Sequence, residues 1–169
     1  MKHKFIATFA CVALALPALA AFSAAAQQAP AAASPVTYRA NVQPFLKAHC
    51  ADCHGAESPT LSEFKLDEEK YTKAKSGPRT DTYENLLQIV AYPDHGAFMR
   101  RLDDGTNTAD KKPGNMYRYL GETDAERAEN LKMLKAWIGE GAWNLNRWGP
   151  RGDVPAVTKE QLDKLQVKY

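Results

Sequence analysis

The spacing of hydrophobic residues predicts a chain of short helices, and no stretch alternates as a half-buried β-strand does. The clearest helix begins at Thr123, because Thr123 and Glu126 form a capping box. Gly139 and Gly141 end this helix. Its predicted apolar stripe consists of Ala128, Leu131, Leu134 and Ile138.

Two shorter helices are predicted before it. Asn41 is a suitable N-cap for a helix that starts at Val42, with Pro44 tolerated in the first turn. The second stretch spans about residues 82–91. Its apolar residues at helical spacing are Leu86, Leu87 and Val90. Residues 59–80 and 102–115 are predicted to be long loops, which a small domain tolerates when a prosthetic group supplies part of the core.

The first 26 residues have the features of a cleaved signal peptide. Lys2 and Lys4 precede an apolar stretch from Phe5 to Leu19, and an A-x-A site ends at Ala26. Cleavage after Ala20 is the alternative. The apolar stretch is shorter than the roughly 20 residues that a membrane-spanning helix needs. We therefore expect a periplasmic product without a stable membrane span.

The rest of the chain is long enough for one domain. Residues 27–37 are rich in Ala, Gln and Pro, so we expect a flexible tail. Lys2 and Lys4 are the only charged residues of the leader, so its removal lowers Lys plus Arg from 22 by two, to equal the 20 Asp plus Glu. A near-neutral protein offers no basic field for nucleic acid, and we expect no nucleic-acid partner.

The motif with the most chemical information is Cys50-Ala51-Asp52-Cys53-His54. Two cysteines at this spacing can each form a thioether to a haem vinyl group, and the adjacent histidine is then placed to bind the iron. A dithiol redox pair or half of a zinc site are the alternatives. Cys11 lies in the leader, so Cys50 and Cys53 are the only cysteines of the exported chain. We therefore predict one covalent haem c, held by Cys50 and Cys53, with His54 as proximal ligand.

With these elements in order, the chain resembles the single-haem class I cytochromes c, and a bacterial subgroup most closely. The resemblance covers about residues 38–142, and residues 143–169 form a C-terminal extension with no assigned role. The matching segments are Tyr38 to Phe45 with its Val-x-Pro, the haem motif, Phe64-Lys65-Leu66-Asp67, Phe98 to Leu102, and Trp137-Ile138-Gly139-Glu140-Gly141-Ala142. The resemblance implies an all-α, small cytochrome c fold with short helices and long loops around the haem.

The resemblance also implies a distal methionine from a loop before the last helix. Met116 occupies that position, although Tyr117 follows it where the family commonly has proline. Met99 is the alternative. Met133 is predicted to lie on an outer face of the last helix. His95, or an open sixth position, is a further possibility.

Polar and aromatic residues complete the predicted haem environment. The haem propionates need donors, and four arginines lie on segments that reach this region: Arg79, Arg100, Arg101 and Arg118. Tyr117, Tyr119 and Trp137 either wall the haem or serve as ordinary core aromatics. His49 is interpreted as a helix residue beside the motif.

These features favour an electron-transfer protein rather than an enzyme. Its predicted partners are a periplasmic dehydrogenase as donor and another cytochrome or an oxidase as acceptor. A second hypothesis is binding of a small gaseous ligand at a five-coordinate or weakly ligated haem. A third is the cytochrome subunit of a dehydrogenase complex, with residues 143–169 as its docking element.

Overall fold

The computed structural model describes residues 35–106, 108, 110–143 and 157–169, which belong to one compact unit. The predicted all-α class is confirmed, since this part of the chain contains helices and no strand. Its elements are η1 (Tyr38–Val42), α1 (Gln43–His49), α2 (Ala51–His54), α3 (Leu61–Leu66), α4 (Glu68–Lys73), α5 (Tyr83–Val90), α6 (Ala97–Leu102), η2 (Tyr117–Leu120), α7 (Asp124–Ile138), η3 (Glu140–Ala142) and α8 (Lys159–Asp163).

Several predictions fall on residues outside this described part. They are the signal peptide (1–26), most of the N-terminal tail (27–34), and residues 144–156 of the predicted C-terminal extension.

The helix before the cysteine motif starts earlier than predicted. Thr37 is its N-cap instead of Asn41, because the Thr37 hydroxyl accepts a hydrogen bond from the backbone N–H of Ala40. The Asn41 side chain accepts a hydrogen bond from the Thr37 N–H at 3.0 Å. The two residues thus cap the turn reciprocally. The π-helical turn η1 therefore runs directly into α1 and brings Val42 and Phe45 into the core.

The helices predicted near residues 82–91 and 124–138 are confirmed as α5 and α7. The Thr82 hydroxyl caps α5 by accepting a hydrogen bond from the Asn85 N–H at 3.2 Å. Thr123 and Glu126 form the predicted capping box at the start of α7, and Gly139 follows its last residue.

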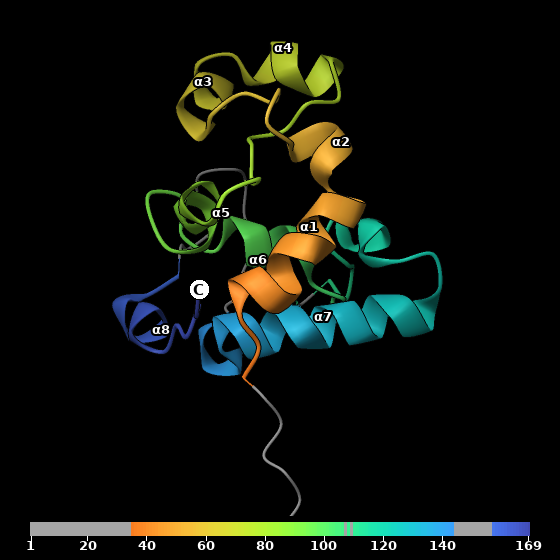
Figure 1. The fold of residues 1–169 in the computed structure, drawn as a ribbon, viewed down its shortest axis with the longest axis vertical. Helices are drawn as coiled ribbons and strands as arrows, with labels where there is room; N and C mark the ends of the chain where they lie inside the picture. The colour runs from red at the N-terminus through yellow and green to blue at the C-terminus, as the bar shows by residue number, and fades with distance from the viewer. Residues whose placement is uncertain (1–34, 107, 109, 144–156) are drawn as a thin grey trace, which may run out of the picture. The chain divides into compact units, whose positions relative to one another are not determined.

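The predicted stripe of α7 is correct only in its second half. Leu131, Leu134 and Ile138 are buried, but Ala128 is exposed because the first half of the helix extends beyond the core (Figure 1). Trp137 is completely buried and joins the core face. Met133, predicted on an outer face, is partly buried and packs against the core.

Two helices, α3 and α4, occupy the region predicted to be a loop at residues 59–80. Thr60 and Glu63 make a complete capping box for α3, and the Asp67 carboxylate caps α4 by accepting from the Lys70 N–H. Both helices have six residues, too few to show a helical period in the sequence. The capping residues Thr60, Glu63 and Asp67 are the sequence features that indicate these two helices. The region 102–115 is confirmed as mainly loop between α6 and η2.

The core forms where α1, α5, α6 and α7 meet. Helix α7 packs against η1, η2 and η3, and α5 packs against α6. Figure 1 shows α7 running beneath α1 and α6, with α3 and α4 above α2 and away from α7. The fully buried side chains include Val42, Leu86, Met99, Leu134 and Trp137.

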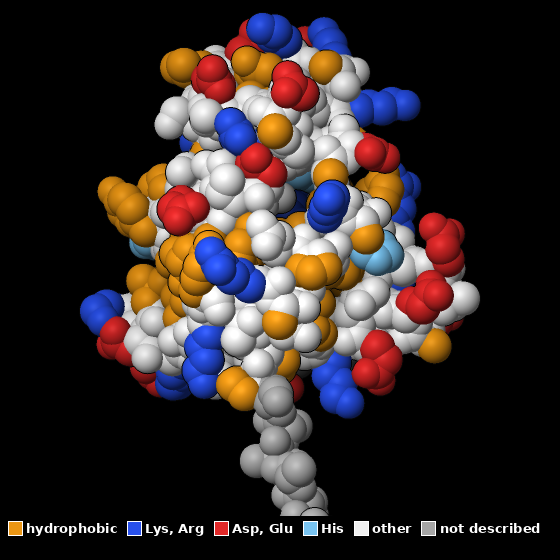
Figure 2. All heavy atoms as spheres, viewed as in Figure 1, with side chains coloured by type: hydrophobic (Ala, Val, Ile, Leu, Met, Phe, Trp, Pro, Cys, Tyr) orange, Lys and Arg blue, Asp and Glu red, His pale blue; other side chains and the backbone are white. Residues whose placement is uncertain are grey.

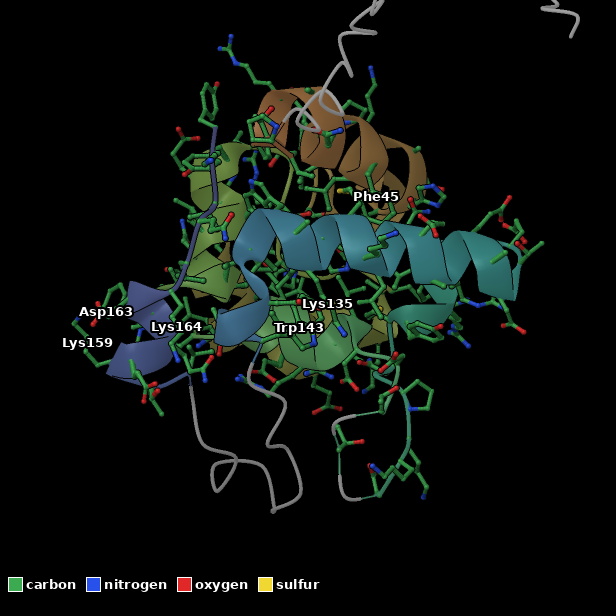
Figure 3. The ribbon with its side chains drawn as sticks, turned by 90° about the horizontal axis from the view of Figure 1, so that it is seen from below. Phe45, Lys135, Trp143, Lys159, Asp163 and Lys164 are labelled. Carbon is green, nitrogen blue, oxygen red and sulfur yellow. The ribbon has the colours of Figure 1, made fainter. Side chains whose placement is uncertain are left out.

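The described end of the chain, residues 157–169, packs on the protein's own core. Trp137 Nε1 donates to the Lys168 carbonyl at 2.8 Å, and the Tyr83 hydroxyl donates to the Val167 carbonyl at 2.7 Å. The Tyr169 ring stacks on Tyr38 at 5.8 Å between centroids. Figure 3 shows α8 beside the end of α7. This segment therefore covers one end of the core.

Trp143 marks the end of the described η3 region. Lys135 of α7 lies over the Trp143 ring, 5.7 Å from its centroid, and Figure 3 shows the two side chains together. Trp143 is 8% exposed and belongs to the buried core, with Lys135 beside its ring.

Acidic and basic side chains are interspersed on the face shown in Figure 2. Among the described residues, no helix is long and apolar enough to cross a membrane.

Candidate haem-attachment site

The predicted haem ligands Cys50, Cys53 and His54 lie on one helical turn that continues α1. The Cys50 N–H donates to the Leu46 carbonyl at 2.9 Å, so Cys50 ends α1. The Cys50 carbonyl accepts from the N–H groups of Cys53 at 3.2 Å and His54 at 2.9 Å. Cys50 is partly buried and Cys53 is exposed. Burial, and then the nearby Cys53, raise the pKa of the Cys50 thiol to about 12.

The His54 imidazole is oriented by a backbone carbonyl. Its Nδ1 lies 2.7 Å from the Pro78 carbonyl oxygen. A carbonyl can only accept a hydrogen bond, so Nδ1 carries the proton and donates it. In the neutral tautomer with this hydrogen bond, the other ring nitrogen, Nε2, carries the lone pair and is the nitrogen able to bind a metal.

The segment 77–80 lies directly against the motif. The Gly77 N–H donates to the Cys53 carbonyl and the Thr80 N–H donates to the His54 carbonyl, each at 2.8 Å. A Cβ on Gly77 would lie 2.1 Å from Cε1 of His54, so only glycine allows this approach. Gly77 and Thr80 contact the motif through backbone atoms, which leave no pattern in the sequence; of this segment, only Arg79 was predicted near the haem.

An ion pair closes the same segment. Arg79 donates from Nε to Asp81 Oδ1 at 2.9 Å and from Nη2 to Oδ2 at 2.7 Å. Asp81 also accepts from Asn85 Nδ2 at 3.2 Å, and its carbonyl accepts from the Tyr38 hydroxyl at 3.3 Å. The Arg79 hydrogen bond is the main cause that holds the pKa of Asp81 below its ordinary value.

A hollow of 590 Å³ lies beside the imidazole, between α1 and the segment that follows Gly77. Its lining includes His54, Leu46, Ala51, Thr80 and Asp81. A second hollow of 660 Å³ lies along α7, with Tyr117 and Lys135 in its wall. Met116 lines neither of them. The structure therefore brings the motif and the 77–81 segment together, and Met116 and His54 do not share either of these two hollows.

The two candidate distal methionines differ in burial. Met116 is partly exposed at the start of η2, and its N–H donates to the Arg101 carbonyl at 2.9 Å. Met99 is fully enclosed in α6, with 0% exposure. Protein atoms therefore surround Met99, whereas Met116 keeps an accessible side.

The predicted propionate-binding arginines have protein partners in this structure. Arg79 pairs with Asp81; Arg100 donates to the His95 carbonyl and pairs with Asp94; Arg101 donates to Asn115; Arg118 donates to the Tyr119 hydroxyl. Burial lowers the pKa of Arg100.

The two other histidines in the described part of the chain, His49 and His95, have aromatic neighbours. The His49 ring stacks on Phe45 at 4.8 Å, as expected of a helix residue beside the motif. His95 lies 5.5 Å from the Tyr92 ring. Within the described part of the chain, no group of three or more His, Cys, Asp or Glu residues has metal-binding geometry, as the zinc alternative would need.

Comparison with known proteins identifies the family. The family model described as PccH cytochrome c matches residues 37–169. The chain belongs to the PccH cytochrome c family. The solved structure of the monoheme cytochrome PccH from Geobacter sulfurreducens is 47% identical, covers 79% of this chain and 98% of its own, and superposes with a TM-score of 0.67. No curated protein matches the chain.

Family membership has three consequences. The predicted recognition as a single-haem cytochrome c is confirmed, the chain carries one covalently bound haem c, and proteins of this family transfer electrons. The family model also covers residues 143–169, which the sequence resemblance had left as an extension. The residues present fit a haem c, because the motif supplies two thiols and an imidazole whose Nε2 is the unprotonated nitrogen.

Proposed function

We propose that this PccH-family cytochrome is a periplasmic electron carrier with Cys50 and Cys53 as thioether anchors, His54 as proximal ligand and Met116 as distal ligand. The observation that supports it best is the hydrogen bond from His54 Nδ1 to the Pro78 carbonyl. This bond fixes the tautomer in which Nε2 binds iron, and it raises the basicity of that nitrogen.

Each residue has a distinct role in this proposal. The two thioethers attach the haem to the chain, and the turn from Cys50 to His54 orients the imidazole toward the iron. A methionine sulfur is a soft, neutral ligand that raises the reduction potential. When bound, the haem supplies an iron whose charge changes by one electron. If His54 and Met116 both bound the iron, no position would remain for a substrate, which favours a carrier over an enzyme.

Burial favours Met116 over Met99 as the distal ligand. A ligand must turn its sulfur toward the iron, and Met116 has an accessible side at the start of a short helix. Met99 has no accessible surface and belongs to the cluster of buried residues that forms the core. Family resemblance supports the same choice, because Met116 is in the loop before the last helix.

The proposed partners are redox proteins. The electron would come from a periplasmic dehydrogenase and pass to another cytochrome or an oxidase. Cytochrome c domains of this kind usually work outside the cytoplasm, and the predicted leader at residues 1–26 supports the periplasm. Residues 165–169 are engaged with the core through Trp137 and Tyr83, which does not favour that part of the chain as a docking element for a dehydrogenase.

The test begins with full-length precursor, expressed in a bacterium that has a cytochrome c maturation system. Mass spectrometry of the exported protein should find the leader removed and one haem on the peptide that contains Cys50 and Cys53. The purified protein should be low-spin in both oxidation states and titrate as a one-electron couple. His54→Ala should lose the low-spin spectrum or fail to mature, and an unchanged spectrum in this variant would contradict the ligand assignment.

A second candidate function is binding of a small gaseous ligand. It is favoured by one observation, that Met116 does not line the hollow beside His54. A five-coordinate ferrous protein would be high-spin and bind carbon monoxide rapidly. The electron-carrier proposal predicts a six-coordinate ferrous protein that binds carbon monoxide slowly and weakly, so this measurement separates the two functions.

A further inference from the structure

The hydrogen-bond partner of His54 is a main-chain group, so its position depends on the conformation of a loop. Pro78 O stands 2.7 Å from His54 Nδ1 and belongs to the segment between α4 and α5. On one side of it, the Gly77 N–H is bonded to the motif. On the other side, the Arg79 N–H donates to the Pro59 carbonyl at 2.8 Å. Beyond Arg79, the Thr80 N–H donates to the His54 carbonyl at 2.8 Å, so backbone bonds hold Gly77, Arg79 and Thr80. Asp81, the next residue in this turn, is held by side-chain contacts.

The Arg79–Asp81 ion pair closes that turn. Its two hydrogen bonds, at 2.9 and 2.7 Å, join residues two apart in the chain and thereby fix the direction of the backbone between them. Asp81 is in turn attached to α5 through Asn85 and to η1 through the Tyr38 hydroxyl. The loop is therefore fastened to two elements of the core at the residue that Arg79 holds.

The pair is partly exposed, with the two side chains 28% and 23% accessible. Ion pairs of this exposure contribute little to the free energy of unfolding on their own. The pair can nevertheless affect the hydrogen bond between the Pro78 carbonyl and His54. A displacement of a few tenths of an ångström weakens a short hydrogen bond.

We propose that the Arg79–Asp81 ion pair is a positioning device that holds the Pro78 carbonyl against His54 and thereby sets the reduction potential. This inference rests on the proposed function, in which His54 is the proximal ligand. A strong hydrogen bond from Nδ1 makes the imidazole a more basic ligand, which favours the ferric state. Removal of the pair should weaken that bond and raise the potential.

The charge-neutral double variant Arg79→Gln/Asp81→Asn is the principal test. Its potential should rise by the equivalent of a two- to fivefold change in the ferric/ferrous equilibrium, about 20–40 mV for a one-electron couple. In NMR spectra of the holoprotein, the His54 Nδ1 proton should exchange with solvent about fivefold faster. The control Glu69→Gln/Lys73→Gln removes an exposed ion pair of equal charge on α4 and should change neither quantity.

The single variants separate positioning from plain electrostatics. Loss of one positive charge and loss of one negative charge shift a potential in opposite directions through Coulomb's law. A positioning pair predicts that Arg79→Gln and Asp81→Asn both raise the potential, and that the double variant shifts no more than the larger single. Opposite signs, or additive shifts, would overturn the proposal.

The conservative variant Arg79→Lys keeps the positive charge but cannot make the bidentate hydrogen bond to Asp81. Its reduction potential should therefore rise less than that of the double variant. If the double variant yields no holoprotein, the reduction potential of Arg79→Lys decides the question. An unchanged potential in Arg79→Lys would then refute the positioning role. Different results would refute ligation by His54 and the role of the ion pair. A wild-type protein without a low-spin spectrum refutes ligation by His54, whereas a low-spin wild type with unaffected variants refutes this inference alone.

Discussion

Gly77→Ala is the substitution whose effect follows most directly from the geometry of the site. A Cβ at this position would lie 2.1 Å from Cε1, 2.6 Å from Nδ1 and 2.9 Å from Nε2 of His54. Non-bonded carbons approach favourably to about 3.5–4.0 Å. The imidazole and the glycine backbone must therefore separate by about 1.4 Å or more.

This displacement breaks the hydrogen bond that orients the ring. The Nδ1 to Pro78 O distance of 2.7 Å would grow to about 4 Å, beyond the range of a hydrogen bond. Overpacking costs about 1–3 kcal/mol and the lost bond about 1 kcal/mol, so we expect about 2–4 kcal/mol less stability. The low-spin spectrum should be weakened or lost, because Nε2 is moved from its place.

The assay compares thermal unfolding and visible spectra of the matured wild type, Gly77→Ala and Gly141→Ala. Gly141 is the matched control, since the atoms nearest to a Cβ there belong to the flexible Lys164 side chain, with Cδ at 2.9 Å. We expect Gly141→Ala to differ from the wild type by about 0.5 kcal/mol or less. If Gly77→Ala keeps the wild-type spectrum and midpoint, the close approach of Gly77 to His54 is refuted.

Three further predictions concern the distal ligand, the C-terminus and acid stability. Met116→Leu should abolish the methionine-to-iron charge-transfer band, lower the potential and open the iron to carbon monoxide, whereas Met99→Leu should leave all three unchanged and cost less than about 1.5 kcal/mol. Deletion of residues 167–169 removes four hydrogen bonds to Tyr38, Tyr83 and Trp137, so calorimetry should show a loss of about 4 kcal/mol. Hydrogen bonds from backbone N–H groups lower the pKa of Glu126. Its contribution to stability is complete above the ordinary value of 4.5 and is lost as the pH falls through the lowered pKa, so Glu126→Gln should flatten the acid limb of a stability curve.

Each of these three predictions has an opposing result. Loss of the charge-transfer band in Met99→Leu, with Met116→Leu unaffected, would transfer the ligand role to Met99. An unchanged unfolding temperature after the deletion would mean that the contacts of residues 167–169 do not stabilise the core. For the acid limb, the control is Glu129→Gln on the same helix, and identical curves for the two variants would argue against the capping carboxylate.

Local signals explain what the sequence predicted well. The capping box of Thr123 and Glu126, and the apolar spacing that follows, located α7 within one residue of its observed start. The same type of signal at Thr60 and Glu63 precedes α3, which is too short to show a helical period and is therefore not predicted by spacing. Asn41 is a plausible cap in the sequence because it precedes Val42, but in the structure the Thr37 hydroxyl caps the turn earlier and the Asn41 side chain accepts from the Thr37 N–H.

The parts of the site that the sequence did not predict are made by long-range contacts and backbone atoms. The Pro78 carbonyl has no side-chain identity, and its contact with His54 spans 24 residues. The stacking of Tyr169 on Tyr38 joins the two ends of the family domain. Neither contact leaves a periodic or spaced pattern, whereas the cysteine motif does because its chemistry requires neighbours in sequence.

The most direct test of the proposed ligation is an NMR spectrum of the reduced holoprotein with ¹³C-labelled methionine methyl groups. When a methionine sulfur binds the iron, the haem ring current shifts the resonance of its methyl group far upfield, outside the range of ordinary methyl groups. The account predicts one such resonance, present in Met99→Leu and absent from Met116→Leu. A spectrum with no upfield methionine methyl, or one that disappears only in Met99→Leu, would contradict Met116 as the distal ligand.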